Sequence, residues 1–172
     1  YGRQFQHLQL SHSAIAPPPS ETAAALVVDI ATAERSRLQQ IRTELPDWVW
    51  QGAGISRDGE MLTVTSQAVA RLQTQFDDLP ITQKLQTGLQ QPSGSLSQLS
   101  SASLRLWSET RNLLELAHLI LKSADFRAAS RGGHYRKDYP DTHPEWQVHT
   151  LVQRDRWWQS APVMSSTAIA ND

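Results

Sequence analysis

LLELAHLILKSADFRAASRGGHYRKDYP, residues 113–140, constrains the fold more than any other stretch of the 172-residue chain. Its first half repeats leucine and alanine at helical spacing, which predicts an amphipathic helix over about residues 103–129. Two consecutive glycines, Gly132 and Gly133, are expected to stop the helix because glycine tolerates positive φ, and Pro140 prevents a return to helix nearby. The charged and aromatic side chains between them should therefore lie in a constrained loop, where binding residues tend to occur.

Two further segments show apolar residues at helical spacing. One begins near Ala33 and contains Pro46, which is expected to kink the helix or divide it into two pieces. A Gly-Ala-Gly run weakens its end and permits a close backbone approach. The other covers residues 58–79 and ends at Pro80. Three such helices can bury their apolar faces only against one another, so the fold is predicted to be mainly α, with a three-helix, spectrin-repeat-like bundle over residues 33–129.

The apolar positions of the second and third helices define the faces expected to pack together in antiparallel fashion. In the second helix the stripe is Leu62, Val69, Leu72, Phe76 and Leu79. In the third helix the expected seam is Leu106, Thr110, Leu113, Ala117, Ile120 and Ala124, widened by Leu114 and Leu121. The opposite stripe of the third helix, from Arg111 to Asp125, is polar and should face solvent or another domain.

The remaining segments have weaker patterns. Residues 1–32 are predicted to be a long N-terminal extended segment, formed by the tail of a helix from an upstream flavin domain and a Pro-rich connection. Residues 80–103 lack a steady period and are expected to form a surface excursion. Residues 130–172 should contain the loop, a small β-hairpin turning at Arg154-Asp155, and a disordered tail. The tryptophan pair at 157–158 is expected to cover the core rather than form a stacking platform.

Composition excludes several classes of function. The formal net charge of −1, without a basic run, argues against a nucleic-acid partner. The longest apolar stretch is far shorter than the ~20 residues of a membrane span. The absence of cysteine removes disulfides, thiolate chemistry and Cys-ligated clusters. The histidines lack carboxylate partners at ligand spacing, so no metal site is predicted. We expect a cytoplasmic protein with neither a nucleic-acid nor a membrane partner.

The loop resembles the C-terminal signature of the flavoprotein family that contains L-aspartate oxidase and the flavoprotein subunits of succinate dehydrogenase and fumarate reductase. That family carries a Ser-Arg-Gly-X-His-X-X-X-Asp-Tyr/Phe-Pro run after a long helix. The matching residues are Ser130, Arg131, Gly132, His134, Asp138, Tyr139 and Pro140. Residues 48–57, 112–116 and 146–150 are similar to further family segments, so the resemblance covers nearly the whole chain.

The resemblance implies FAD chemistry in a larger parent enzyme. The chain lacks the Gly-x-Gly-x-x-Gly loop that cradles a pyrophosphate, so FAD is expected to be bound by an upstream domain and not by this chain, which alone should be inactive. Within the family, the loop residues favour L-aspartate oxidase, which converts L-aspartate to iminoaspartate for NAD biosynthesis. One alternative is the flavoprotein subunit of a succinate dehydrogenase or fumarate reductase. The other is a non-enzymatic helical interaction module.

No catalytic, cofactor-binding or metal-binding residue is assigned from the sequence, because the family's catalytic residues are implied to lie upstream. The candidate residues are instead those of an interdomain signature loop, expected on the surface and covered by the parent enzyme's own flavin and capping domains. Two interpretations of its charges stay open. Arg131 and Asp138 could hold the loop against the flavin domain, which we favour, or an arginine fork could bind a dicarboxylate. The loop residues are Ser130, Arg131, Gly132, Gly133, His134, Arg136, Asp138, Tyr139 and Pro140.

Overall fold

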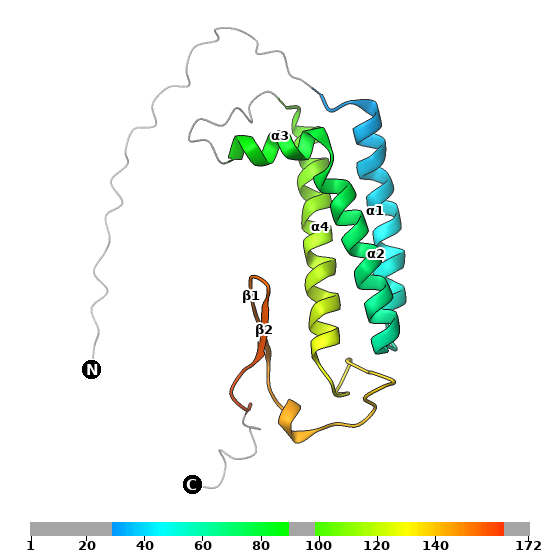
Figure 1. Cartoon of the computed structure of the whole chain (residues 1–172), viewed down its shortest axis with the longest axis vertical. Helices are drawn as coiled ribbons and strands as arrows, with labels where there is room; N and C mark the ends of the chain where they lie inside the picture. Colours follow the sequence, from blue (N-terminus) through cyan, green and yellow to red (C-terminus); the bar gives the residue numbers. More distant parts are fainter. Residues whose placement is uncertain (1–28, 90–98, 164–172) are drawn as a thin grey trace, which may run out of the picture.

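The computed structural model describes residues 29–89 and 99–163, so the predictions for the N-terminal extended segment and the C-terminal tail lie outside the described residues. Figure 1 shows three long helices packed side by side, a short helix across one end, and a small hairpin beside α4. The elements are α1 (Thr32–Ala53), α2 (Gly59–Asp77), α3 (Pro80–Leu89), α4 (Ser101–Phe126), the 3₁₀ turn η2 (Pro144–Trp146), β1 (Thr150–Gln153) and β2 (Arg156–Gln159).

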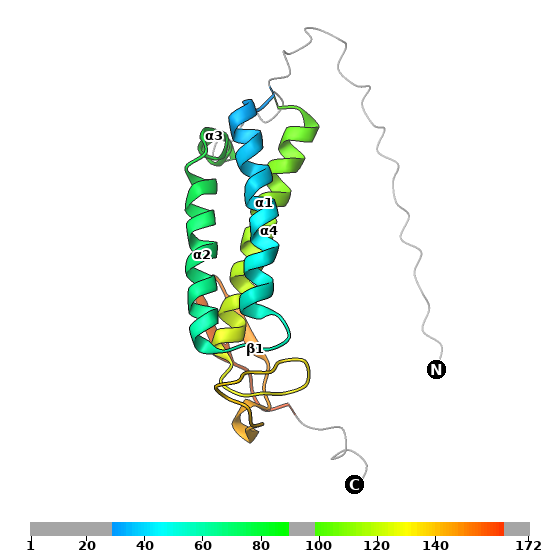
Figure 2. The same ribbon diagram turned by 90° about the vertical axis from the view of Figure 1, so that its right-hand side faces the viewer.

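The predicted mainly helical fold with a C-terminal hairpin is confirmed. Following the colours of Figures 1 and 2 along the chain, α1 and α4 run in the same direction and α2 runs between them in the opposite one. Each helix contributes an apolar stripe to one shared core, as amphipathic helices must if they are to exclude water. The fully buried aliphatic and aromatic side chains come from all three: Leu38 and Ile41 from α1, Leu62 and Phe76 from α2, and Leu114 from α4.

Helices α1 and α2 approach closely where glycine replaces a side chain. A Cβ atom on Gly52 would lie 2.5 Å from the Cβ of Thr65, which is fully buried on α2. The predicted close backbone approach is therefore confirmed, and glycine is required there by space rather than by backbone conformation. Helix α1 also continues through Pro46 as one element, so the expected division into two pieces is wrong.

The core face of α4 differs from the predicted seam. Leu113 and Ile120 are 39% and 41% exposed, whereas Leu114 is fully buried, with Trp107 and Leu121 nearly so. The Trp107 ring stacks on Phe76 of α2 with centroids 5.8 Å apart. Apolar residues occur on almost every side of this helix, so spacing alone admits two neighbouring faces. The large indole of Trp107 fits the core, and its position places Leu114 inward.

Residues 80–89 form helix α3, which the sequence interpretation missed. Pro80 occupies its first turn, where its missing N–H would have no intrahelical partner in any case. The Glu34 carboxylate accepts a hydrogen bond from the backbone N–H of Ile81 at 2.7 Å. The Trp107 indole N–H donates to Thr82 Oγ1 at 2.9 Å, which ties α3 to α4. Pro80 thus ends one helix and begins the next.

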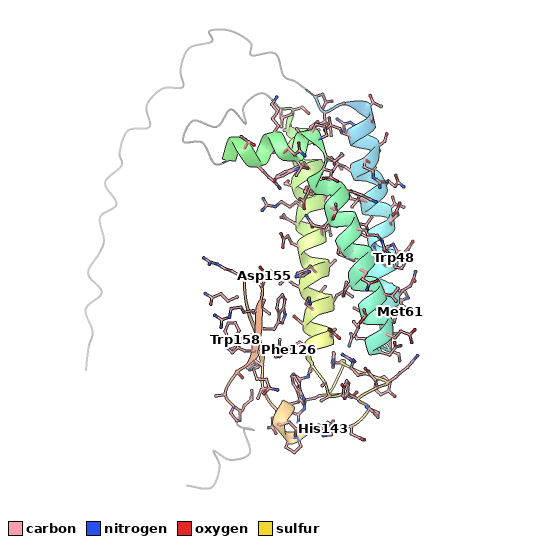
Figure 3. All side chains as sticks on the ribbon, in the orientation of Figure 1. Trp48, Met61, Phe126, His143, Asp155 and Trp158 are labelled. Atoms are coloured by element: carbon pink, nitrogen blue, oxygen red, sulfur yellow. The ribbon has the colours of Figure 1, made fainter. Side chains whose placement is uncertain are left out.

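Helix α4 ends at Phe126, earlier than predicted, and not at a glycine. Arg127 leaves the helix with an extended backbone, and Gly132, at φ 57°, makes a turn inside the following loop. The Phe126 ring, labelled in Figure 3, meets the Trp146 ring of η2 edge to face at 5.6 Å. Packing of the chain that follows therefore sets the end of the helix.

The hairpin forms at the predicted place, with Arg154 at φ 55° in its turn. The Trp157 indole N–H donates to Ser123 Oγ of α4 at 3.2 Å, and its ring meets His118 edge to face at 5.8 Å. Trp158 is exposed. The two tryptophans therefore separate, since neighbours on a strand point to opposite faces, and only Trp157 covers α4.

Candidate functional site

The signature loop after α4 is held by its own backbone. Arg131 and His134 exchange backbone hydrogen bonds of 2.8 and 3.0 Å across the turn at Gly132. The buried Ser130 hydroxyl donates to Tyr139 O at 2.7 Å and accepts from the backbone N–H of Arg136 at 2.9 Å. One small side chain thereby fixes both arms of the loop, which explains a serine at this position.

The α1–α2 connection forms the other wall of the loop. The backbone N–H of Arg57 donates to Tyr135 O at 3.1 Å, and Arg57 O accepts from the N–H of Lys137 at 2.7 Å. These bonds make a short parallel bridge between Arg57 and Arg136. The signature loop is therefore positioned by two segments that lie far apart in the sequence.

Arg136 is the central side chain of this junction. It is only 2% exposed, and its Nη1 donates to the carbonyls of Ala124 and Asp125 at 2.9 and 3.0 Å, which are free acceptors at the end of α4. Its Nε and Nη2 bind both carboxylate oxygens of Asp138 at 2.8 and 2.5 Å. The second Asp138 oxygen also accepts the N–H of Gly59, at the start of α2, at 3.0 Å. A cation thus lies at a helix C-terminus and an anion at an N-terminus, as helix dipoles favour.

This pairing sets the protonation of Asp138. The Arg136 hydrogen bonds lower the pKa of the Asp138 carboxyl to about 2, against a smaller opposing effect of burial. The same bonds raise the pKa of the Arg136 guanidinium. Both groups are charged at neutral pH, and they form a bidentate ion pair in which one partner is buried.

The expected exposure of the whole loop is therefore wrong for two residues. Ser130 and Arg136 are buried by partners within this chain, because helix ends offer unpaired carbonyls that a pattern of apolar stripes does not reveal. Asp138 contacts Arg136 and Gly59 in the same chain rather than waiting for another domain. Arg131 does remain exposed, and among the described residues its side chain makes no hydrogen bond or ion pair. Gly132, Gly133, Tyr139 and Pro140 are exposed as predicted.

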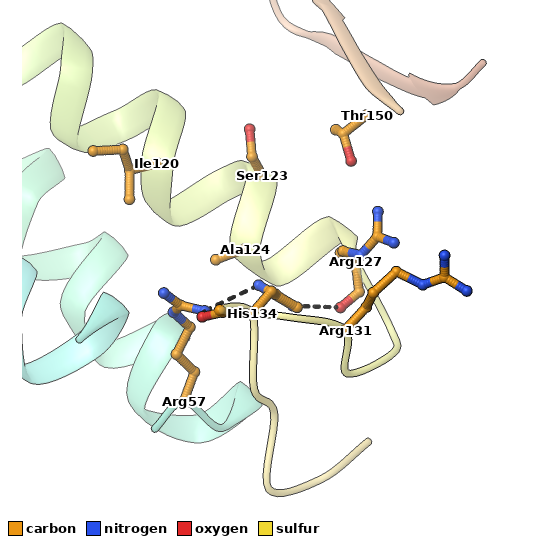
Figure 4. A pocket seen from close by; sticks show the side chains of 9 residues that line it. Arg57, Ile120, Ser123, Ala124, Arg127, Arg131, His134 and Thr150 are labelled. Carbon is orange, nitrogen blue, oxygen red and sulfur yellow. Dashed lines mark hydrogen bonds between the residues drawn. The ribbon is translucent and has the colours of Figure 1, made fainter. Parts of the chain in front are cut away.

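A hollow of about 470 Å³ lies between the loop, the end of α4 and the start of β1. Figure 4 shows Arg57 and His134 at one side of it, and Arg127 and Arg131 at the other. Its lining residues are Arg57, Ile120, Ser123, Ala124, Arg127, Arg131, Gly133, His134 and Thr150. Sequence interpretation did not find Arg57 and Arg127, because they belong to two other segments and carry no local signal of a shared site.

His134 is half-buried in this hollow and neutral. Its Nδ1 lies 3.1 Å from Nη1 of Arg57, which can only donate, and its Nε2 lies 3.4 Å from the carbonyl of Arg127, which can only accept. These neighbours assign the proton to Nε2. Burial lowers the pKa of the His134 imidazole, and repulsion from Arg57, Arg127 and Arg136 adds to this effect, although the Arg127 carbonyl opposes it.

The arginines around His134 are held in place by carbonyl groups. Arg57 donates to Ala53 O at 3.2 Å and to Gly133 O at 3.3 Å. Arg127 donates to Trp146 O and Val148 O, and its guanidinium lies over the Trp146 ring. Carbonyl groups orient a guanidinium without neutralising it, so this hollow concentrates positive charge.

A second, more apolar hollow of about 620 Å³ adjoins the first, since Arg57 and Gly133 line both. It is bordered by two exposed apolar side chains, Trp50 at 68% and Ile55 at 78% exposed. Monomeric proteins seldom expose such large apolar groups together, and clusters of them mark contact surfaces.

Two other classes of site find no support in the described part of the chain. No group of three or more histidine, aspartate or glutamate side chains is placed to hold a metal ion there. None of the described helices combines the length and apolarity needed to cross a membrane.

The chain belongs to the family described as the fumarate reductase flavoprotein C-terminal domain, which it matches over residues 42–169. It is 48% identical over 136 residues to an L-aspartate oxidase of a Nostoc species, covering 77% of this chain and 23% of that protein. An L-aspartate oxidase of a Synechocystis species is 43% identical over 129 residues, covering 73% and 23%. A protein of the fumarate reductase (CoM/CoB) of Methanothermobacter marburgensis is 36% identical over 118 residues, covering 69% and 19%.

The chain thus spans less than a quarter of the length of these relatives. No solved structure gives a significant match. The family resemblance of the signature loop is confirmed, and the matched region includes all of α2, α4, the loop and the hairpin.

Proposed function

We propose that this chain is the C-terminal helical domain of an FAD-dependent L-aspartate oxidase, which oxidises L-aspartate to iminoaspartate for NAD biosynthesis in the cytoplasm. The observation that carries the proposal is the 48% identity to the Nostoc L-aspartate oxidase over most of the chain. Identity to the Methanothermobacter fumarate reductase is lower, at 36%, which favours the oxidase over the dicarboxylate reductase alternative. In this proposal the flavin and the substrate are held by a preceding part of the protein, and the chain alone binds no FAD.

The role proposed for the chain is to cover and support that flavin-binding part. The exposed side chains of the signature loop lie beside the apolar rim formed by Trp50 and Ile55, since one hollow touches both. Apolar groups at the centre and charged groups at the edge are the usual composition of a protein contact surface. The flavin and capping domains of the parent enzyme are the proposed occupants of this surface.

The substrate assignment is tested with the longer protein encoded by the reading frame that contains this chain. Under anaerobic conditions L-aspartate should bleach the flavin absorbance, while succinate at the same concentration should not. Bleaching by succinate without bleaching by L-aspartate would instead favour the dehydrogenase alternative. The 172-residue chain purified alone should be colourless.

The covering role is tested with two aliphatic truncations. Ile55→Ala alters the proposed contact surface, whereas Val64→Ala alters an exposed position on α2, which lies on another face of the bundle. In the longer protein Ile55→Ala should lower flavin retention and the thermal midpoint, and Val64→Ala should change neither. Neither variant should alter the stability of the 172-residue chain itself. Equal behaviour of the two variants in the longer protein would count against the proposed surface.

A further inference from the structure

The hollow beside His134 has an unbalanced charge. Its lining contains three arginines, Arg57, Arg127 and Arg131, and no aspartate or glutamate. Among the described residues none of the three has a carboxylate within 4.0 Å, although Arg136, a few residues away, is paired with Asp138. His134 adds no charge, because its Nδ1 accepts from Arg57.

The charges in the hollow are also arranged in advance. The carbonyl bonds of Arg57 and Arg127 fix two guanidinium groups before any ligand arrives, which reduces the entropy lost on binding. Arg131 stands at the edge of the hollow with its donors unused among the described residues. The Thr150 side chain adds a hydroxyl, and Ile120 and Ala124 supply an apolar wall that limits access of water.

We propose that this hollow is a binding site for a carboxylate group, with Arg131 as the direct, bidentate ligand and Arg57 and Arg127 as fixed positive charges around it. A guanidinium fork matches the two oxygens of a carboxylate in geometry, and such charge-assisted bonds are strong for their kind. The volume of about 470 Å³ accommodates a small dicarboxylate, and equally the end of an acidic side chain. The proposal holds whether or not the longer protein oxidises L-aspartate.

Binding is tested on the 172-residue chain with succinate as the probe, by calorimetry and by the ¹⁵N resonances of the His134 imidazole. We expect a dissociation constant on the order of 1 mM at low ionic strength. Arg131→Gln should weaken binding about tenfold or more, because hydrogen bonds to charged groups are involved. Arg71→Gln, which removes the same charge from an exposed position on α2 outside the hollow, should leave binding unchanged.

The source of the carboxylate is decided with the longer protein. Succinate binding there as well would identify a free dicarboxylate as the ligand. Loss of binding there, with retention in the 172-residue chain, would identify an acidic side chain of the longer protein as the occupant. The proposal is overturned if succinate does not bind the 172-residue chain, if Arg131→Gln binds as well as the parent sequence, or if chloride at equal ionic strength gives the same imidazole shifts.

Discussion

Replacing Arg136 with methionine removes every donor of the guanidinium while keeping much of the side-chain length. The carbonyls of Ala124 and Asp125 then lose their partner at the end of α4, and Asp138 loses the cation that holds it. Breaking a buried ion pair by removing one partner costs about 3–5 kcal/mol. Asp138 is partly exposed and regains water, which places Arg136→Met in the lower half of that range, at about 3 kcal/mol.

The measurement is urea unfolding of the 172-residue chain followed by far-ultraviolet circular dichroism. Arg131→Met is the matched control, because it removes the same charge from the same loop at an exposed position without a partner among the described residues. It should change the free energy of unfolding by less than about 0.5 kcal/mol. If both variants change it by similar amounts, Arg136 does not act through the bonds described here and the loop is not a structural junction.

Acid titration examines the same pair independently. The folded state holds the pKa of Asp138 at about 2, below its ordinary 3.8. The unfolded chain therefore takes up the proton first as the pH falls, so the stabilisation is complete above pH 3.8 and is lost as the pH falls toward 2. Solvent screening limits it to about 1 kcal/mol. In Arg136→Met this acid-sensitive part should disappear.

Three further perturbations have defined outcomes. Gly52→Ala should lower the free energy of unfolding by about 1–3 kcal/mol because the new methyl group meets α2, whereas Gly88→Ala, with open space around it, should raise it slightly; equal effects would contradict the close approach. Leu114→Ala should cost about 2–5 kcal/mol, and Leu113→Ala, which is largely exposed, much less; the reverse order would show that the face of α4 is misassigned. Because the pKa of His134 is lowered in the folded state, its stabilisation is complete above pH 6.5 and falls as the pH drops below it; His134→Asn should remove this dependence, and an unchanged profile would refute the neutral tautomer.

Helix number and the hairpin could be predicted from sequence because they depend on short-range periodicity and turn residues. The face of α4 could not be fixed in this way, since Leu113 and Leu114 are equally apolar and only packing against Phe76 distinguishes them. Helix α3 was hidden for a different reason. Its stability depends on contacts with Glu34 and Trp107, which lie far away in the sequence.

The candidate site was predictable only in part. The signature loop could be located because its residues are consecutive and match a family pattern. The roles of its charges could not be assigned, because Arg136 and Arg131 look alike in sequence and differ only in what surrounds them. Arg57 enters the site through a backbone bridge with Arg136, and no local pattern announces such a pairing.

The bridge between the α1–α2 connection and the signature loop also has a kinetic consequence. The Gly59–Asp138 bond joins residues 79 positions apart, so closing it early would cost much chain entropy for few contacts. Helices α1 and α2 are neighbours in sequence and can pair first, with α4 docking afterwards. The loop should then close after the rate-limiting step of folding. Contacts made by Arg136 would slow unfolding while scarcely changing the folding rate, which makes this junction a determinant of how long the native fold persists.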